Sequence, residues 1–265
     1  MSKPDLHVVS FSGGKDSTAM LLRMKELGMK IDVILYCDTT VEFPAMYDHI
    51  KKVEEYIGLP ITVLRNDKDF EHYLLQYEPK KRNGEKQIGL SFPDSRVRWC
   101  TRYLKMDLIR RYFKELKEHY NVIEYVGLAS DETHRLERDN NKRENVRHPL
   151  VEWGWTEAYA LHYCYEKGFD FGGLYELFNR VSCWCCPLKP LSELRVLRKE
   201  FPELWAKLLD WQAQTWRTFK ADYSVQELDI RFQFEEEKLA KGESITNRQF
   251  YKELKERLRE EAESE

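Results

Sequence analysis

A double glycine between an apolar run and an amphipathic segment constrains this chain more than any other feature. Leu6–Phe11 is short and apolar, which predicts a buried strand, and residues 16–27 carry apolar side chains at helical spacing. The turn between them reads Ser12-Gly-Gly-Lys-Asp-Ser17. Glycines let a backbone approach a ligand closely, and the first turn of a helix presents free N–H groups and a positive dipole end. We therefore expect a phosphate-binding loop, although a Gly-rich turn that only caps the helix has the same outline.

The loop is made of glycines, of residues with hydroxyl side chains, and of one lysine followed by an aspartate. The pattern is neither a Walker A motif nor a Gly-x-Gly-x-x-Gly dinucleotide fingerprint. We expect the following residues to bind the nucleotide: Ser10, Ser12, Gly13, Gly14, Lys15, Asp16, Ser17 and Thr18. Lys15 and Asp16 are also expected to act in catalysis.

Strand-like and helix-like segments alternate along the first half of the chain. Further strands are predicted at residues 31–36, 60–64 and 122–128, with helices at 44–57 and 101–119. This alternation predicts an α/β fold, a parallel twisted sheet flanked by helices on both faces. Residues 78–98 and 130–147 are polar and without clear period, so we expect a long loop and a second mobile segment there.

Ligands of such sheets bind beyond the carboxyl ends of the strands. Asp38 follows the second predicted strand and is expected to act in catalysis, and Asp131 and Arg135 follow the fourth and are expected to bind the nucleotide. The carboxylates of Asp38, Glu42, Asp131 and Glu132 are of the kind that Mg²⁺ prefers, although helix capping or solvation accounts for them equally well.

The second part of the chain has a different pattern. From Leu191 onward, apolar residues recur at helical spacing almost to the end. We therefore expect two domains, an α/β nucleotide-binding domain over residues 1–186 and an all-helical C-terminal extension over residues 187–265.

Composition sets limits on partners and compartment. The 265 residues carry a net charge of -3, so no global basic field argues for nucleic acid. Local basic stretches, Lys80–Arg82 and several arginines and lysines of 96–111 and 135–147, fit phosphate contacts or a solvated face equally well. Neither a signal peptide nor a membrane-spanning run is evident, which predicts a cytoplasmic protein without membrane contact.

The glycine loop resembles the SGGxDS PP-loop of ATP pyrophosphatases and of the 3′-phosphoadenylylsulfate (PAPS) reductase family. Later segments resemble the reductase branch: Asp38–Pro44, with Thr40 where that branch has Gly; Gly127–Arg135, with Ala129 in place of Arg; Trp153–Glu157; and Leu174-Tyr175 with Cys183-Trp-Cys-Cys186-Pro187. The resemblance covers about residues 7–190 and is strongest to short members from mobile elements. It implies an adenine nucleotide alpha hydrolase-like fold that binds ATP, or PAPS or its 5′-phosphosulfate analogue APS, with Mg²⁺.

Cysteines give the second chemical signal. Cys183 and Cys186 form a Cys-x-x-Cys motif with Cys185 inside it, and Cys100 lies 83 residues before Cys183. The resemblance to sulfonucleotide reductases implies a [4Fe–4S] cluster, although Trp99 replaces the first cysteine of their usual pair. We expect Cys100, Cys183 and Cys186 to hold the metal. The fourth position is either left open or taken by Cys185, by Cys37 or by a group other than cysteine. Zinc is the alternative metal, and buried free thiols are the alternative without metal.

The expected function follows from what the reductase pattern lacks here. Those reductases use a cysteine near the C-terminus, whereas no cysteine follows Cys186 in this sequence. We therefore expect adenylyl transfer from ATP with pyrophosphate release, coupled to sulfur transfer. The alternatives are a thiol-dependent PAPS or APS reductase and a non-catalytic nucleotide-binding subunit. The acceptor is open between tRNA, DNA, a small molecule and a protein, and a sulfur-donor protein is a further expected partner.

Overall fold

The computed structural model describes residues 3–80, 84, 86–137, 143–181 and 183–264. It consists of two compact units. The first comprises the chain up to Phe70 together with Trp99–Trp184, and the second comprises Glu71–Arg98 together with the chain from Cys185 onward.

The first unit is built on a parallel sheet. Its strands lie in the order β3-β2-β1-β4-β5 and every neighbouring pair is parallel. Their bounds are β1 Asp5–Ser10, β2 Val33–Asp38, β3 Ile61–Arg65, β4 Asn121–Val126 and β5 Val146–Arg147. The central strand β1 pairs Val9 with Ile34 of β2 and with Tyr125 of β4, so the carboxyl ends of these three strands lie at one edge of the sheet.

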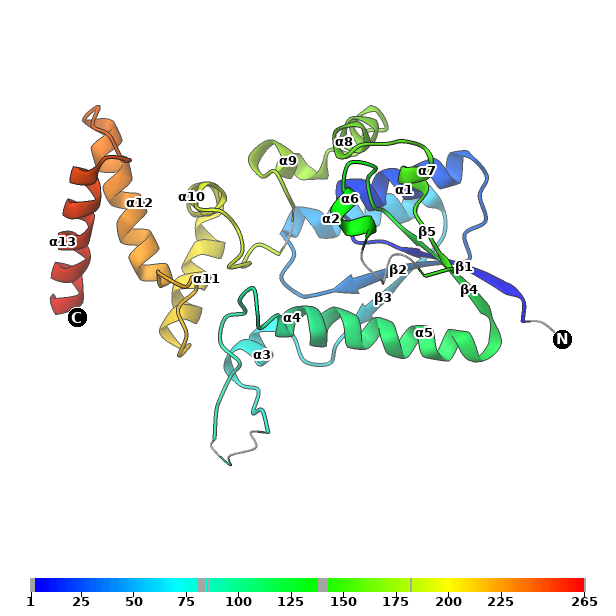
Figure 1. The fold of residues 1–265 in the computed structure, drawn as a ribbon, viewed down its shortest axis with the longest axis horizontal. Coiled ribbons are helices and arrows are strands. Elements are labelled where there is room, and N and C mark those ends of the chain that lie inside the picture. Colours follow the sequence, from blue (N-terminus) through cyan, green and yellow to red (C-terminus); the bar gives the residue numbers. More distant parts are fainter. Residues whose placement is uncertain (1–2, 81–83, 85, 138–142, 182, 265) are drawn as a thin grey trace. The chain divides into compact units, whose positions relative to one another are not determined.

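Helices cover both faces of this sheet (Figure 1). α1 (Lys15–Glu26), α2 (Pro44–Ile57) and α8 (Glu157–Glu166) lie on one face, and α5 (Asp107–His119) lies on the other. Under α5, Phe113 packs with Val8, Leu35 and Val122 of the strands. The predicted α/β fold, with a parallel sheet between helices, is confirmed.

Shorter helical segments complete the first unit. They are α4 (Trp99–Thr101), α6 (Thr133–Leu136), α7 (Pro149–Glu152), the 3₁₀ turn Phe171–Gly173 and α9 (Leu174–Leu177). A π-helical segment, Arg102–Met106, joins α4 to α5, so the helix expected at 101–119 begins at Trp99 and is not α-helical throughout.

Two expectations for the sheet were wrong in detail. β4 ends at Val126 and does not reach residue 128. A Cβ on Gly127 would lie 2.7 Å from the Ser17 backbone, so the chain leaves the sheet here to pass α1. The polar segment 130–147 includes α6 and the two-residue strand β5, which its polar composition hides.

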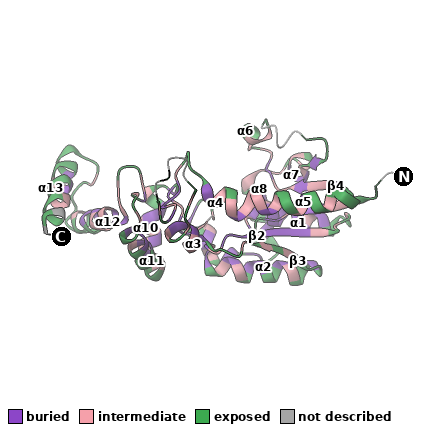
Figure 2. Cartoon of the chain, turned by 90° about the horizontal axis from the view of Figure 1, so that it is seen from below, coloured by how far each residue is buried: buried purple, intermediate pink, exposed green. Residues whose placement is uncertain are grey.

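The second unit is helical, as expected for the C-terminal part of the chain. Its helices are α3 (Phe70–Leu75, which begins at the unit boundary), α10 (Leu191–Glu200), α11 (Pro202–Ala213), α12 (Val225–Ala240) and α13 (Arg248–Ser264). Ser224 and Glu227 form a capping box that begins α12. Figure 2 shows buried positions alternating with exposed ones along these helices, as amphipathic packing requires.

The division into units departs from the expected boundary after Cys186, because residues 71–98 group with the helices. Arg217 explains much of this grouping. Its backbone N–H donates to Ser91 Oγ at 3.0 Å, and its guanidinium contacts Asp94 Oδ2 at 2.8 Å. Phe92 also packs edge-to-face on Phe219. These contacts tie the long loop to the turn between α11 and α12.

Within the residues that the structure describes, none of the helices has the length and apolar character needed to cross a membrane.

Candidate functional site

The glycine loop connects the end of β1 to the start of α1. Gly13 adopts φ +80°, a left-handed conformation that favours glycine, and Gly14 is the N-cap of α1. Ser17 Oγ lies 3.0 Å from Ser12 Oγ and accepts the Ser12 N–H at 3.2 Å. The loop is thus closed on itself by its own hydroxyls, which holds its backbone against the helix N-terminus.

Thr18 fixes the loop from the core side. Its hydroxyl lies 3.0 Å from His49 Nε2 and 3.3 Å from the Gly13 carbonyl oxygen. Burial lowers the pKa of His49 to about 4, so the ring is neutral at pH 7. Gly13, Ser17 and Thr18 therefore shape the loop, and none of them lines the pocket described next.

A cavity of about 320 Å³ opens in front of the loop. The segments that follow β1, β2 and β4 all contribute to it, which is the edge where ligands of parallel sheets bind. Its lining consists of Ser12, Gly14, Lys15, Asp16, Glu42, Met46, Lys105, Gly127, Glu132, Arg135, Glu157, Tyr175, Arg180, Val181 and Cys183. Of the residues expected to bind nucleotide, Ser12, Gly14, Lys15, Asp16 and Arg135 are brought together here.

Lys15 is the best-defined cation of the pocket. It is 8% exposed, and its Nζ lies 2.5 Å from Glu157 Oε2 and 3.5 Å from Asp16 Oδ2. Its backbone N–H donates to the Tyr175 hydroxyl at 2.9 Å. Its ammonium and its backbone N–H are therefore engaged by side chains that come from distant parts of the sequence.

The carboxylates of the pocket carry unsatisfied oxygens. Within the described part of the chain, Asp16 Oδ1 and Glu132 Oε2 are buried and have no hydrogen-bond partner. Burial raises the pKa of Asp16 to about 6, and the Glu157 and Glu132 carboxylates add to that shift while Lys15 opposes it. Glu132 uses its other oxygen in an ion pair with Arg135. Buried acceptor atoms without a partner, on two residues that line a cavity, fit a bound cation better than they fit a dry core.

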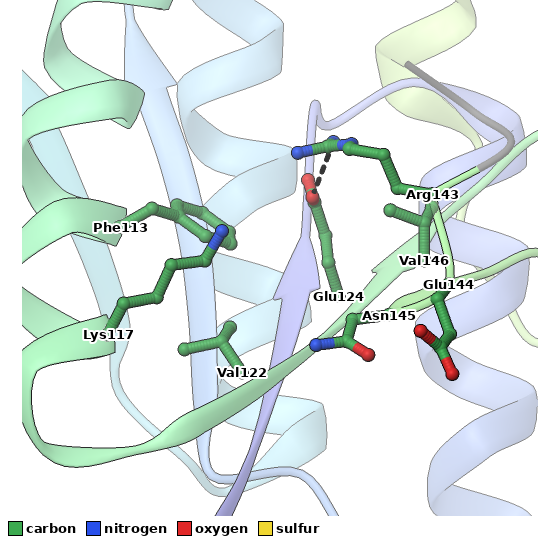
Figure 3. A pocket seen from close by; sticks show the side chains of 8 residues that line it. All are labelled: Phe113, Lys117, Val122, Glu124, Arg143, Glu144, Asn145 and Val146. Carbon is green, nitrogen blue, oxygen red and sulfur yellow. Dashed lines mark hydrogen bonds and ion pairs between the residues drawn. The ribbon is translucent and has the colours of Figure 1, made fainter. Parts of the chain in front are cut away.

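Three of the expected site residues are used elsewhere. Ser10 donates its hydroxyl to Glu124 Oε1 at 2.8 Å, and Glu124 lines a separate hollow together with Phe113 and Val146. Figure 3 shows Glu124 pointing toward Arg143 in that hollow, and their ion pair is 3.1 Å long. Ser10 therefore belongs to the β1–β4 contact, since it does not line the pocket beside the glycine loop.

Asp38 and Asp131 also have structural partners. Asp38 is buried, accepts from the Thr40 N–H at 2.8 Å and from the Tyr47 hydroxyl at 3.0 Å, and lies 3.5 Å from Arg65. Asp131 accepts from the Glu157 N–H at 3.1 Å at the start of α8. Neither carboxylate lines the cavity, and each instead positions a segment that does.

The cysteines are partly brought together. All six are free thiols, and Cys183 lines the cavity with its Sγ 3.6 Å from Thr39 Oγ1 and 3.8 Å from Glu42 Oε1. Cys100 lies in the short helix α4. Cys185 and Cys186 belong to the second unit.

Lys105 interacts electrostatically with three of the thiols, those of Cys37, Cys100 and Cys183. Burial lowers the pKa of Lys105, but Cys183, Glu42, Cys37 and Cys100 outweigh it, so that pKa lies above its usual value. Burial also raises the pKa of the Cys37 thiol to about 11. In the part of the chain with described coordinates, no group of three His, Cys, Asp or Glu residues is arranged to hold a metal ion. The expected ligands are divided between the two units, Cys100 and Cys183 in the first and Cys185 and Cys186 in the second, and that ligand set stays a prediction.

Several pocket residues were not singled out as site residues from the sequence, namely Glu157, Tyr175, Lys105 and Arg180. Glu157 and Tyr175 stand in segments noted for family resemblance, Trp153–Glu157 and Leu174-Tyr175, which was the available signal. Lys105 was visible only as one of many basic residues. Of the basic positions considered for phosphate binding, Lys81, Arg82, Arg138 and Lys142 lie outside the described residues.

The chain is similar in sequence to three other proteins, each of them uncharacterised. Two are uncharacterised proteins of Methanocaldococcus jannaschii, 28% and 29% identical over 208 and 209 residues, each match covering 76% of this chain. The third is an uncharacterised nin region protein of Escherichia phage lambda, 26% identical over 67% of this chain and 65% of the phage protein. This chain spans 40% and 46% of the two archaeal proteins, about half of their length.

A solved structure is also similar. It is the phosphoadenylyl-sulfate reductase of Candida auris in a phosphate complex, 18% identical, with a TM-score of 0.46 over 67% of this chain and 81% of that chain.

The family model of the phosphoadenosine phosphosulfate reductase domain matches residues 6–189. The match begins in β1, runs through the glycine loop and the cavity, and ends just after the Cys183–Cys186 motif. Because it covers well over half of the sequence, this chain belongs to the phosphoadenosine phosphosulfate reductase domain family.

Proposed function

We propose that this chain binds ATP on its glycine loop and transfers the adenylyl group to an acceptor, with release of pyrophosphate and subsequent sulfur transfer. One observation carries the proposal. Ser12, Gly14 and Lys15 at a helix N-terminus line the same cavity as Arg135 and as two carboxylates, Asp16 and Glu132, that each have one unsatisfied oxygen. Such a site offers donors for phosphate oxygens and acceptors for a cation together.

The reaction makes one bond and breaks one. An acceptor oxygen attacks the α-phosphorus, and the bond from that phosphorus to the oxygen bridging to the β-phosphorus breaks. The electron pair leaves on pyrophosphate. Lys15, Arg135 and the first turn of α1 would neutralise that charge where it accumulates, so positioning and electrostatics supply most of the rate.

Mg²⁺ fits this site in the manner usual for nucleotide enzymes. Asp16 and Glu132 would hold the ion through their unsatisfied oxygens, with the remaining positions left to phosphate and water. Bound there, the ion would neutralise phosphate charge.

A thiol-dependent sulfonucleotide reductase is the second candidate, because Cys183 lines the same cavity beside Lys105. Its thiolate would attack the sulfur of PAPS or APS and break the bond from that sulfur to the phosphate oxygen, so that the nucleotide leaves with its 5′-phosphate. A second thiol would then form a disulfide with Cys183 and release sulfite. A nucleotide-binding subunit without turnover would bind the nucleotide and form neither product.

The test uses ATP labelled at the α-phosphate, Mg²⁺, and separate RNA, DNA and protein fractions as acceptors. We expect pyrophosphate release and label on one fraction. Lys15→Met should abolish both, whereas Lys51→Met on the exposed face of α2 should not change them. Release of orthophosphate in place of pyrophosphate would contradict the proposal, as would sulfite formation from PAPS with a thiol donor.

A further inference from the structure

Lys15 holds the two donors that a phosphate chain would need, and both already have acceptors in the protein. Nζ contacts Glu157 Oε2 at 2.5 Å and the backbone N–H contacts the Tyr175 hydroxyl at 2.9 Å. Glu157 and Tyr175 both line the cavity, and they come from α8 and α9 rather than from the loop. An anionic oxygen and a neutral hydroxyl thus occupy the ammonium and the backbone N–H of Lys15.

We propose that Glu157 and Tyr175 are internal substitutes for two phosphate oxygens, and that they restrict the loop to ligands that displace both together. The proposal rests on the function proposed above and names its ligand class, which is a pyrophosphate-type chain of two linked anionic groups. A single phosphate would displace one of the two substitutes and leave the other in place. Its binding would therefore be weaker than that of a pyrophosphate-type chain.

The backbone around Glu157 is fixed while its side chain can move. Its N–H is bonded to Asp131 Oδ1 at 3.1 Å, and Thr156 caps α8 by accepting the Tyr159 N–H at 3.2 Å. The Glu157 side chain itself is 42% exposed. It can therefore release Lys15 by rotating toward solvent without any change in α8.

Tyr175 contacts the loop through its hydroxyl, whereas its ring packs against a neighbouring aromatic side chain. The ring packs edge-to-face on Phe171 and lies 5.7 Å from Lys15 Nζ. Burial raises the pKa of Tyr175, so its hydroxyl is protonated at neutral pH. A neutral hydroxyl accepts the Lys15 N–H less strongly than a charged phosphate oxygen would, so the exchange favours the ligand.

When a phosphate displaces Glu157 from Lys15, the displacement has an electrostatic cost, and this cost disfavours weakly bound ligands. Once phosphate takes Lys15, the Glu157 carboxylate loses its cation in a cavity that also holds Asp16 and Glu132. Like charges in one cavity repel each other, so the ligand must gain enough from Lys15 and the helix N-terminus to offset that repulsion. Removal of the Glu157 charge should therefore tighten anion binding, although the same substitution removes an ion pair from the site.

The test is isothermal titration calorimetry of the full chain with pyrophosphate and with orthophosphate, in EDTA and again with Mg²⁺. Glu157→Gln and Tyr175→Phe should each tighten pyrophosphate binding about fivefold, because each loses one competing contact. Glu166→Gln, at the far end of α8 and exposed, is the matched control and should bind as the wild type does. The wild type should bind pyrophosphate more tightly than orthophosphate.

Each other outcome overturns the proposal in a recognisable way. Weaker binding by Glu157→Gln would mean that Glu157 holds Lys15 in its binding position, and the proposed function would stand because the wild type still binds. Weaker binding only with Mg²⁺ would mean that Glu157 is a cation ligand. Equal affinity for the two anions would show that a single exchange suffices. No binding by the wild type or either variant would overturn this proposal and the proposed function together.

Discussion

Asp16→Asn should stabilise the protein at neutral pH, because the wild-type carboxylate is ionised in a place that disfavours its charge. Burial, with help from Glu157 and Glu132, raises the pKa of Asp16 from 3.8 to about 6. The folded state therefore binds this proton more tightly than the unfolded state does. The stability from protonation is fully present below pH 3.8 and is lost as pH rises through about 6.

The size of the effect follows from the shift. About two pKa units correspond to roughly 3 kcal/mol, so Asp16→Asn should gain on the order of 2–3 kcal/mol at pH 7 and well under 1 kcal/mol at pH 4. Hydrogen exchange of α1 amides in increasing urea, without divalent cations, reports the unfolding of the first unit. Asp48→Asn, on an exposed turn of α2, is the matched control.

A stability gain for Asp16→Asn that does not change between pH 4 and pH 7, or no gain at all, would refute this reasoning. The expected gain also has a functional meaning. Because the proposed function assigns Asp16 to a bound cation, the variant should bind ATP with Mg²⁺ more weakly although it is more stable.

The other predictions concern backbone positions and one helix cap, each checked by urea unfolding. Gly127→Ala should destabilise the protein by about 2–3 kcal/mol, because its Cβ would lie 2.7 Å from the Ser17 backbone; stability equal to wild type would contradict that close approach. Thr40 has φ +67° and accepts the Phe70 N–H, so Thr40→Gly should be more stable than Thr40→Ala by about 1–2 kcal/mol, and the reverse order would exclude strain there. Ser224→Ala should cost about 1 kcal/mol through loss of the capping box of α12, and an unchanged midpoint would show that the box adds nothing.

The sequence was sufficient where local pattern and local structure coincide. The strand, glycine loop and helix over Asp5–Glu26 follow from apolar periodicity and from two adjacent glycines, and the helix expected at 44–57 has those bounds in the structure. Thr40 occupies the place of a family glycine and keeps the positive φ that glycine would adopt. The PP-loop identification directed attention to the carboxyl end of β1, where the structure has a cavity.

The remaining site residues depend on contacts between distant segments. Glu157 and Tyr175 meet Lys15 across 142 and 160 residues, and nothing in the local pattern of either segment encodes that meeting. Contacts between different segments also explain why Ser10 and Asp38, which were expected in the site, have partners within the protein. Their chemistry suits a ligand, but Glu124 and Tyr47 satisfy them once the strands and α2 are in place. Two-residue β5 and the π segment are too short to produce a period.

A crystal structure with Mg²⁺ and an ATP analogue, methylene-bridged between its α- and β-phosphates, tests the central claim most directly. The account predicts that the β- and γ-phosphates lie on Ser12, Gly14 and the Lys15 N–H, with Lys15 Nζ on phosphate and no longer on Glu157. An analogue bound away from the glycine loop, or a Lys15–Glu157 contact that persists with the nucleotide in the cavity, would contradict it.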